Sequence, residues 1–302
     1  MNNEQLRVVG NSLYQTHIAK EMKRYLVFMG RCYLHKRQME DLFAFLEATP
    51  LRQKLLAGNP SFVEQVTRSF FYKDSTWEER IALVKEHISF LERSSTPELL
   101  DRLYCKQESV TLWEEDFQEH PLRLGLRFHA GQRKEGCLSL VLTWQDEELY
   151  QIMFWLGKNL QGAGSALWVG ALQGRPQGGD VVKALTKKFF GYRTKNLIFY
   201  GLRNIAAVWG CECIYAVTNQ GYYAMNHMRV DRKLKTDFGE FWAECGGELS
   251  PDPRFYQIPI EEYRKDMSEL KPSKRAQHRR RFEVLDIITE CIQKSLAPYL
   301  KK

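Results

Sequence analysis

The first candidate for chemistry is a glycine-rich loop at residues 173–179, with the sequence Gln-Gly-Arg-Pro-Gln-Gly-Gly. A helix is predicted at 180–190, and a helix N-terminus attracts anions because its first backbone N–H groups have no partner within the helix. The residues predicted to hold an anion are Gln173, Gly174, Arg175, Gly178 and Gly179. The alternative is an ordinary turn from a strand to a helix that happens to be rich in glycine.

A second candidate is a cluster of positive charge close to the C-terminus. The chain has a net charge of +7, and residues 264–302 hold 11 Lys and Arg against 5 Asp and Glu, which leaves only +1 for residues 1–263. The sequence predicts a basic linker over 271–281, followed by an amphipathic helix with one apolar face. The residues predicted to meet an anionic surface are Lys274, Arg275, Arg279, Arg280 and Arg281.

This basic segment has three interpretations. It could bind an anionic lipid leaflet, where each basic residue near the surface gains about 1 kcal/mol and the apolar helix face enters the headgroup boundary. It could bind RNA, because phosphate contacts need Lys and Arg but no motif. In the third interpretation, the helix docks on the body through Leu285, Ile288 and Ile292, and the charges are solvated. Of the two anionic partners, the lipid surface is favoured over nucleic acid.

Several signatures of common enzymes are absent from the sequence. It has no G-x-S-x-G, no G-x-x-x-x-G-K-[ST], no G-x-G-x-x-G, no H-E-x-x-H and no C-x-x-C. These absences argue against serine hydrolases, P-loop nucleotidases, Rossmann oxidoreductases and the common zinc enzymes. Cys211 and Cys213 lie in an apolar strand, where packing is a better explanation than metal binding, so no metal site is predicted.

The elements that position these residues begin with helices. Apolar residues recur at steps of three and four over 12–104, which predicts four or five short helices. Ser61 with Glu64 and Thr76 with Glu79 have the spacing of capping boxes, and Pro97 suits a first helical position.

Short β-rich segments follow at 122–130, 136–144, 148–157 and 166–173, and their short connections predict an antiparallel meander. After the glycine-rich loop, the pattern predicts two helices, a strand, a short helix and two further strands. Their predicted ranges are 180–190, 194–209, 211–218, 221–228, 238–245 and 254–260.

The predicted fold class is therefore α+β, with a mixed, mainly antiparallel sheet. We expect a helical region at 1–110, an α/β domain at 111–263, and a basic linker with an amphipathic helix at 264–302. The charged N-terminus does not suit a signal peptide, no apolar run suits a membrane span, and seven scattered cysteines suit a reducing compartment. We expect a cytoplasmic protein that is peripheral to the inner membrane if the basic tail binds lipid.

This order of elements over the second half of the chain resembles the GNAT acyltransferase fold. The resemblance implies that the loop at 173–179 holds the pyrophosphate of coenzyme A, although Pro176 replaces the first glycine of the family pattern. If the protein is such an enzyme, its donor is acyl-coenzyme A or acyl-carrier protein. The fold then requires a cleft at the splayed end of the strands at 166–173 and 211–218, with Gly178, Gly179 and Tyr222 or Tyr223 facing into it.

A downstream run also resembles the GNAT pattern, because Asn219 ends a strand, Tyr222 and Tyr223 follow on a short helix, and Gly246-Gly247 ends a later segment. In that family a tyrosine on this helix often protonates the leaving thiolate, a role that suits a hydroxyl with a free pKa of about 10. Tyr222 and Tyr223 are thus the candidate catalytic residues. Packing of both rings in the core is the alternative.

Most of the chain also resembles the VirK/YbjX family of Gram-negative bacteria. The matching residues are Asn59-Pro60, Trp-Glu-Glu-Arg-Ile at 77–81, Leu-Gln-Gly at 172–174, Lys-Ala-Leu-Thr-Lys at 183–187, Gly-Tyr-Arg-Thr-Lys-Asn-Leu at 191–197, Trp242, Gly246-Gly247 and Tyr-Gln-Ile-Pro at 256–259. The resemblance implies a bacterial protein that supports the cell envelope, surface display of a virulence factor and resistance to antimicrobial peptides. It implies no particular reaction.

Three functions therefore remain open. The first is a protein of envelope maintenance that acts at an anionic inner-membrane surface or through an envelope-biogenesis partner. The second is a GNAT-like transferase that moves an acyl or aminoacyl group onto an envelope component or a protein. The third is an RNA-binding regulator of virulence genes.

Overall fold

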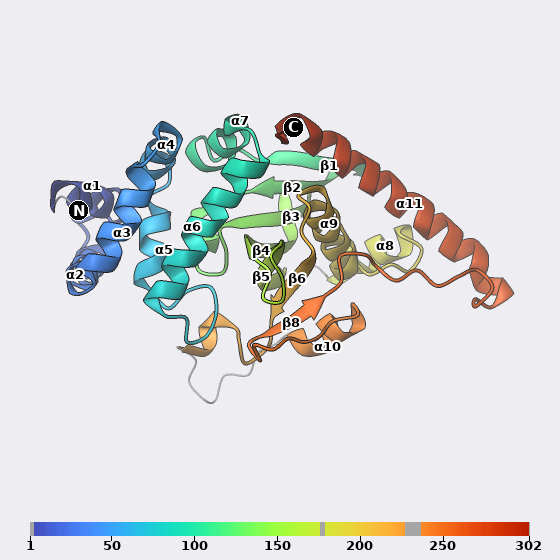
Figure 1. Cartoon of the computed structure of the whole chain (residues 1–302). Coiled ribbons are helices and arrows are strands. Elements are labelled where there is room, and N and C mark those ends of the chain that lie inside the picture. Colours follow the sequence, from blue (N-terminus) through green and yellow to red (C-terminus); the bar gives the residue numbers. More distant parts are fainter. Residues whose placement is uncertain (1–2, 176–178, 227–236, 302) are drawn as a thin grey trace.

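The structure is a computed structural model that describes residues 3–175, 179–226 and 237–301. It confirms the α+β class, because helices cover both faces of one mixed, mainly antiparallel sheet (Figure 1). A long C-terminal helix, α11 (Pro272–Leu296), runs diagonally across one side of the molecule.

The N-terminal region is helical, as predicted, but its described residues form more than the four or five helices expected. Thr76 forms the predicted capping box with Glu79, and Pro97 lies in the first turn of its helix. Ser61 instead lies inside a helix, after Pro60, and makes no cap. The helices are α1 (Asn3–Leu13), α2 (Ala19–Leu34), α3 (Lys36–Glu47), α4 (Pro50–Gly58), α5 (Ser61–Thr67), α6 (Trp77–Ser94), α7 (Pro97–Leu100) and a π-helical turn, η1 (Asp101–Cys105).

In the described chain, eight strands form one sheet in the order β1-β2-β3-β4-β5-β6-β8-β7. Neighbouring strands are antiparallel except for β5 and β6, which are parallel. The strands are β1 (Val110–Phe117), β2 (His120–Arg127), β3 (Leu138–Trp144), β4 (Glu147–Lys158), β5 (Ser165–Gly174), β6 (Cys213–Val217), β7 (Glu248–Leu249) and β8 (Phe255–Ile258).

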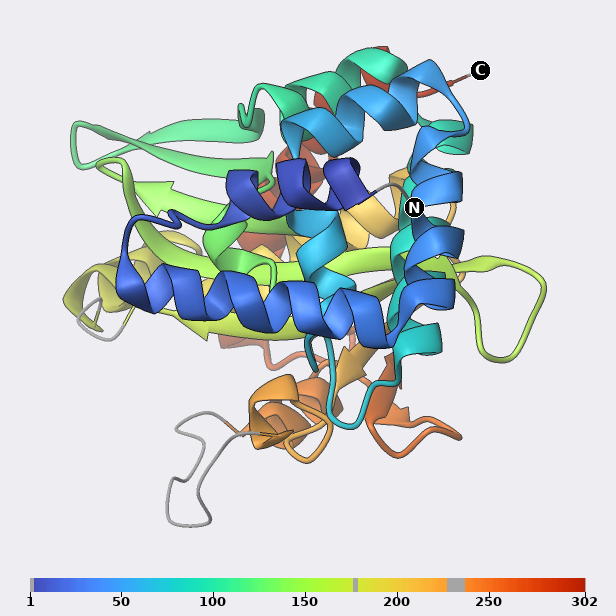
Figure 2. The same ribbon diagram turned by 90° about the vertical axis from the view of Figure 1, so that its left-hand side faces the viewer.

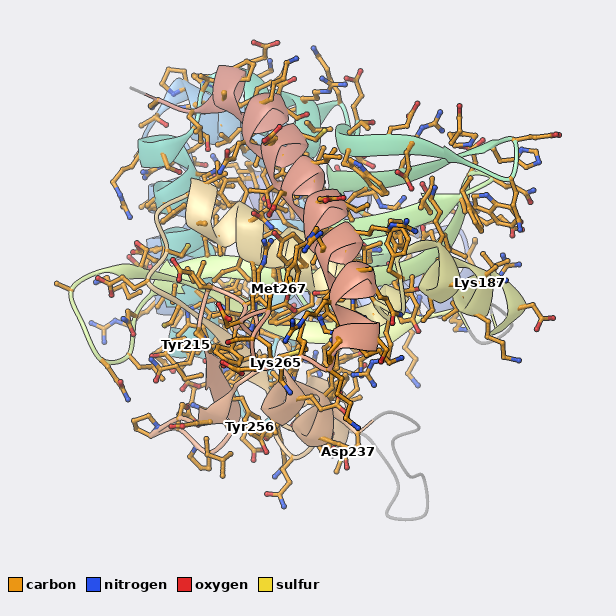
Figure 3. The ribbon with its side chains drawn as sticks, turned by 90° about the vertical axis from the view of Figure 1, so that its right-hand side faces the viewer. Lys187, Tyr215, Asp237, Tyr256, Lys265 and Met267 are labelled. Atoms are coloured by element: carbon orange, nitrogen blue, oxygen red, sulfur yellow. The ribbon has the colours of Figure 1, made fainter. Side chains whose placement is uncertain are left out.

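Helices α8 (Gly179–Lys188) and α9 (Thr194–Val208) connect the parallel pair, which requires such a crossover. The helix α6 packs against β4 on one face of the sheet, whereas α9 packs against β3 to β6 on the other. Figure 2 shows α1 and α2 in front of the sheet, and Figure 3 shows α11 crossing α9 on the opposite side. The remaining elements are η2 (Ala130–Gln132), η3 (Tyr223–Asn226), α10 (Phe238–Glu244) and η4 (Ala297–Tyr299).

One hydrophobic cluster extends through the described chain, from Leu6 in α1 to Leu296 in α11. It draws buried side chains from each of the three regions expected from the sequence. The boundaries predicted for these regions remain a prediction.

Strand β1 was not predicted. Its turn to β2 consists of Gln118 and Glu119, which both have positive φ angles. Asn and Gly are the usual residues in such a turn, so Gln-Glu gave no turn signal. A register shift between Thr111 and Trp113 also interrupts the alternation of apolar and polar residues that marks a strand.

The strand predicted at 238–245 is wrong, because these residues form helix α10. Asp237 caps the helix by accepting a hydrogen bond from the Glu240 backbone, and Phe238, Phe241 and Trp242 lie on its buried face. These aromatic residues have helical spacing, and Asp237 with Glu240 has the spacing of an N-terminal cap. Two strands do follow β6, as expected, but the first of them is β7 at Glu248–Leu249, after the predicted range of 238–245.

The basic run predicted as a linker at 271–281 is also helical, because α11 begins at Pro272. Proline suits the first turn of a helix, because the backbone N–H groups there have no acceptor within the helix and the N–H that proline lacks is not needed. Side chains from the run also hold the helix in place: Gln277 and Arg281 both donate hydrogen bonds to the Phe190 carbonyl, at 2.9 and 2.8 Å. These contacts order a segment whose charge alone would favour solvent exposure.

Candidate functional site

The site is built where the parallel strands β5 and β6 stop pairing. Their register runs from Ala166 opposite Cys213 to Val169 opposite Ala216, and β5 then continues alone to Gly174. Gly170 forms a bulge between β4 and β5, because the register shifts from Phe154 opposite Val169 to Met153 opposite Ala171. Bulges commonly redirect side chains next to functional sites.

The loop before β3 crosses the sheet at this bulge. A Cβ atom on Gly170 would lie 1.9 Å from the Glu135 carbonyl oxygen, so only glycine allows the loop to lie so close. The Gln65 side chain holds the same loop by donating to the carbonyls of Arg133 and Gly136, at 2.8 and 2.9 Å. Backbone and side-chain contacts thus fix the position of Glu135.

The Glu135 carboxylate lies at the centre of the site. It is 5% exposed and accepts a hydrogen bond of 2.5 Å from the Tyr222 hydroxyl. The Gln173 amide donates to both carboxylate oxygens, at 2.9 and 2.7 Å. Gln173 itself is exposed, so the carboxylate lies one side chain below the surface.

Burial raises the pKa of Glu135 to about 7, although the hydrogen bonds from Tyr222 and Gln173 and the charge of Lys134 oppose the shift. Burial, followed by the charge of Glu135, raises the pKa of Tyr222 well above its usual value. A carboxyl group that titrates near neutral pH can both accept and release a proton, which is the property required of an acid–base catalyst.

A short segment of the helical region positions the tyrosines. Tyr72 forms an isolated antiparallel bridge with Tyr222, and the Lys73 backbone donates to the Gly221 carbonyl at 2.8 Å. The Phe71 backbone donates to the Lys134 carbonyl at 2.8 Å, so the same segment holds both sides of the Glu135–Tyr222 pair.

Tyr223 lies next to this pair but makes a different set of contacts. Its ring lies 5.1 Å from the Tyr222 ring and 6.2 Å from the Phe70 ring. Burial, with the charge of Glu135, raises the pKa of Tyr223 to about 12. Both tyrosines are half-buried, and only Tyr222 has a described hydrogen bond to the carboxylate.

The predicted anion loop is described only in part, because Gly178 lies outside the described residues. Gln173 and Gly174 end the ladder with β4, and the Arg175 backbone N–H already donates to the Leu149 carbonyl at 2.9 Å. The Arg175 guanidinium pairs with Glu147.

At the other end of the loop, α8 begins at Gly179, and a Cβ atom added to this residue would meet nothing within 4 Å. The next residue, Asp180, adds an exposed carboxylate to the same first turn. A carboxylate there opposes the binding of another anion. The described residues therefore do not by themselves form a cradle for a pyrophosphate. Coenzyme A binding at this loop remains a prediction.

The five basic residues predicted to meet an anionic surface fall into two groups. Lys274, Arg275, Arg279 and Arg280 are exposed on α11. Arg281 instead donates to the Phe190 carbonyl and lies over the Tyr192 ring, and burial lowers its pKa.

The apolar face of α11 is covered by the rest of the molecule. Leu285, Ile288 and Ile292 are all buried, and the helix packs against α9 and β1. In this structure the face is therefore not available to enter a headgroup layer. The four exposed basic residues still form a positive surface at the start of the helix.

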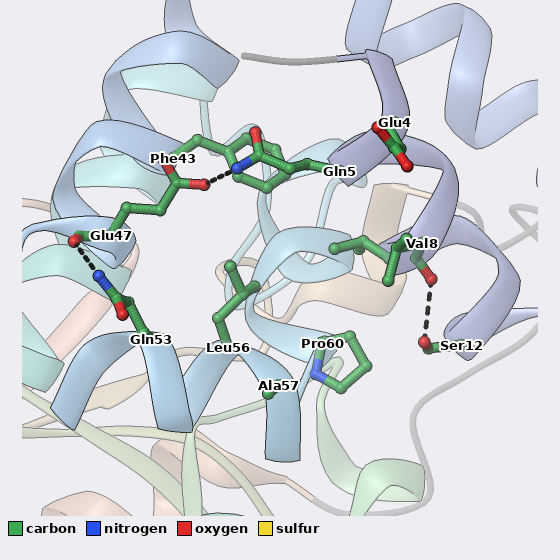
Figure 4. Close-up of a pocket in the computed structure, with 11 residues that line it drawn as sticks. Glu4, Gln5, Val8, Ser12, Phe43, Glu47, Gln53, Leu56, Ala57 and Pro60 are labelled. Carbon is green, nitrogen blue, oxygen red and sulfur yellow. Dashed lines mark hydrogen bonds between the residues drawn. The ribbon is translucent and has the colours of Figure 1, made fainter. Parts of the chain in front are cut away.

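A separate cavity of about 730 Å³ lies between α1, α3 and α4 (Figure 4). Gln5 donates a hydrogen bond of 2.5 Å to Glu47 at its edge, and Val8 and Leu56 supply apolar surface. Its lining does not include Glu135 or the side chains around it, namely Gln173, Tyr222 and Tyr223.

Two kinds of feature are absent from the described residues. No group of three or more His, Cys, Asp or Glu side chains is placed to hold a metal ion. Within the same residues, no helix combines the length and the apolar character needed to cross a membrane.

Sequence reasoning selected Tyr222 and Gln173 but missed Glu135. The carboxylate is 38 residues from Gln173 and 87 residues from Tyr222 along the chain. Its local sequence, Arg-Lys-Glu-Gly, is that of an ordinary polar loop. Only the tertiary fold, with Gly170 beneath the loop, brings it into the site.

Comparisons with known proteins agree with the predicted family. The family described as "Protein of unknown function (DUF535)" matches residues 17–294. An "Uncharacterized protein" of Haemophilus influenzae is 26% identical over 280 residues, which cover 91% of each chain. The "Uncharacterized protein YbjX" of Escherichia coli (strain K12) is 24% identical over 269 residues, which cover 86% of this chain and 80% of that protein. No solved structure matches the chain significantly. The chain therefore belongs to the DUF535 family and is similar to YbjX.

Proposed function

We propose that this protein is a GNAT-like transferase in which Glu135 and Tyr222 form the acid–base pair. The observation that carries the proposal is the buried Glu135 carboxylate, which is held by Tyr222 and Gln173 at the end of β5. The succession of antiparallel strands, glycine-rich loop, helices, parallel strand and two final strands supports it. Ligands commonly bind beyond the carboxyl ends of parallel strands in such sheets.

In the proposed reaction, the acceptor loses a proton to Glu135 as its amine or hydroxyl attacks the acyl group. Tyr222 gives its hydroxyl proton to the leaving group and recovers a proton from Glu135, to which it is hydrogen-bonded. Protonation of Glu135 also removes the negative charge that helps to raise the Tyr222 pKa, so the hydroxyl becomes a better acid at the moment it is needed.

The biological setting follows from the family resemblance. We propose that the acceptor is an envelope component or a protein, and that the donor is acyl-coenzyme A or acyl-carrier protein. The protein would act in the cytoplasm, at the inner-membrane surface, and thereby support envelope integrity, display of a virulence factor and resistance to antimicrobial peptides. Its positive α11 surface is consistent with this location.

The test compares Glu135→Gln with the wild-type chain in a bacterial strain from which the gene has been deleted. The wild-type chain is expected to restore survival in a cationic antimicrobial peptide, whereas Glu135→Gln is not. For the purified proteins, with a bacterial envelope extract supplying the acceptor amine or hydroxyl, the rate of thiol release from acetyl-coenzyme A is expected to fall by about 10²-fold or more, the usual loss when an acid–base group is removed.

The control is Glu283→Gln, which removes an exposed carboxyl from α11 and leaves the site intact. It is expected to behave like the wild-type chain in both measurements. If Glu135→Gln restores survival as fully as the wild type, this site is not catalytic. If the wild-type chain does not restore survival, the envelope role is wrong.

A further inference from the structure

A pocket separate from both the Glu135 site and the cavity between α1, α3 and α4 has an excess of positive charge. It has a volume of about 280 Å³ and lies among α2, α6 and the segment after α5. Three arginines line it, namely Arg31, Arg68 and Arg80, together with His35 and Trp77. Its lining contains no Asp or Glu among the residues that the structure describes.

Only one of these arginines forms an ion pair with a carboxylate among the described residues. Arg68 pairs with Glu64 at 3.1 Å, and Glu64 also pairs with Arg133. Glu79 pairs instead with Arg254 at 3.1 Å, and the Glu78 carboxylate accepts from Gln38 at 3.1 Å.

Arg31 and Arg80 make no ion pair within the described part of the chain. Arg31 donates to the Thr67 carbonyl at 3.2 Å, and Arg80 donates to the Val66 carbonyl at 2.9 Å and to Ser75. Arg80 is 3% exposed, and burial lowers its pKa to about 10, so it remains charged near neutral pH. The charges of Glu78 and Glu79 act to raise the pKa of Arg80 from a distance, but its hydrogen bonds go only to neutral groups. A bound anion would stabilise a buried guanidinium in this position further.

We infer that this pocket binds the phosphate group of a ligand. Guanidinium groups match phosphate oxygens with paired hydrogen bonds, and two arginines without a described ion pair match the charge of a phosphate dianion better than that of a single carboxylate. Trp77 also lines the pocket, with its ring stacked on His35 at a centroid distance of 4.0 Å and the Arg80 guanidinium 5.6 Å from its centroid. The inference does not depend on the proposed transferase reaction.

The position of the pocket suggests how it would be used. Phe70 lines it, and the Phe70 ring lies 6.2 Å from the Tyr223 ring. One aromatic side chain therefore separates the phosphate pocket from the tyrosines next to Glu135. A ligand anchored here would extend along the surface that contains Tyr222.

The test measures binding of inorganic phosphate to the full chain by calorimetry and by thermal shift, at constant ionic strength. Phosphate is expected to raise the melting temperature, because a ligand that binds only the folded state stabilises it. Arg31→Gln is expected to weaken binding about tenfold or more, the usual effect of losing one hydrogen bond to a charged group. Arg31 is exposed and makes a single described hydrogen bond, so this variant is expected to fold.

Two further variants sharpen the result. Arg31→Lys keeps the charge but loses the planar fork, so an intermediate affinity is expected. Lys187→Gln removes one positive charge from the last turn of α8, which belongs to none of the proposed binding surfaces, and is expected to leave phosphate binding unchanged (Figure 3). Equal losses for Arg31→Gln and Lys187→Gln would indicate non-specific attraction and overturn the inference.

The source of the phosphate is resolved by comparing glycerol 3-phosphate with a short-chain, monomeric phosphatidic acid. Tighter binding of the second probe, lost in Arg31→Gln, would identify a lipid headgroup; tighter binding of the first would identify a soluble phosphate ester. Acetate is the probe for carboxylates. If acetate stabilises the chain as much as phosphate does, or if no phosphate probe binds at millimolar concentration, the inference is wrong.

Discussion

Glu135 couples the chemistry of the site to the stability of the fold. Its pKa is about 7 in the folded chain, against an ordinary value of 4.5, because burial disfavours the charged form. Between these pH values the folded chain keeps a proton that the unfolded chain has lost. The free energy of unfolding must therefore fall as pH rises through this window.

Replacing Glu135 with Gln should remove this dependence. Each unit of pKa difference corresponds to about 1.4 kcal/mol. From pH 4.5 to pH 8, the free energy of unfolding of Glu135→Gln should therefore rise by about 3 kcal/mol relative to that of the wild type. The groups facing the carboxyl, Tyr222, Tyr223, Lys134 and Gln173, are the same in both proteins. Urea unfolding at several pH values measures the difference.

The comparison needs an exposed carboxyl as its reference. Glu283→Gln on α11 is expected to track the wild type over the same pH range, because an isolated surface substitution usually changes stability little. A difference for Glu135→Gln that stays constant with pH would show that the carboxyl is ionised normally in the folded state.

At the scale of single residues, the sequence could identify side chains whose chemistry is expressed locally. Tyr222 and Gln173 lie beside a recognisable strand, loop and short helix, and the structure places both at one carboxylate. Glu135 could not be identified, because its significance depends on burial by segments far away in the sequence. When a polar residue in a loop is buried, the neighbouring sequence shows no periodic spacing of apolar residues that would indicate it.

At the scale of elements, the bulge in β5 determines whether the Glu135 loop can lie on the sheet. Gly170→Ala would place a methyl group 1.9 Å from the Glu135 carbonyl oxygen, and the loop would have to move. We expect a loss of about 1–3 kcal/mol of stability, as is usual for overpacking a tight contact, together with loss of the activity proposed for Glu135. Denaturant unfolding and the survival assay measure the two effects.

Gly30→Ala is the matched control for this substitution. Gly30 lies within α2, and an added Cβ would meet nothing within 4 Å. Since alanine is a better helix former than glycine by about 1 kcal/mol, this variant should be more stable than the wild type. If both substitutions stabilise the protein, the close approach at Gly170 is not a constraint.

The elements that were predicted correctly have strong local signals, and the errors have identifiable causes. The turn between β3 and β4 contains Gln145-Asp146, and the sequence identified it. The Gln118-Glu119 turn has the same positive φ angles but lacks a typical turn residue, so β1 was missed. For α10, the aromatic residues favoured a strand by propensity, whereas their helical spacing and Asp237 determined the outcome.

At the scale of the whole molecule, α11 closes the fold and limits how the protein can meet a membrane. Its buried residues pack against α9 and β1, although α11 lies far from both elements along the sequence. The sequence showed that the helix had an apolar face. It could not show whether protein or lipid covers that face, because either partner satisfies the same pattern.

Because this apolar face is covered, we expect the proposed binding of α11 to anionic vesicles to be purely electrostatic. Replacing both Arg279 and Arg280 with Gln should weaken binding to phosphatidylglycerol vesicles by about 2 kcal/mol, or roughly 30-fold, since each basic residue near such a surface contributes about 1 kcal/mol. Vesicle sedimentation measures the change. High salt should release the wild-type chain, because exposed charges are screened and no apolar face of α11 is inserted.

The matched control removes two exposed lysines outside α11, by combining Lys106→Gln with Lys158→Gln. It has the same net charge as the arginine variant, so a similar loss of binding would mean that total charge, rather than the α11 surface, determines vesicle binding. Equal binding of the wild type to neutral phosphatidylcholine vesicles, or binding that survives high salt, would require an apolar contact. In that case α11 would have to leave the core, and membrane binding would be coupled to partial opening of the fold.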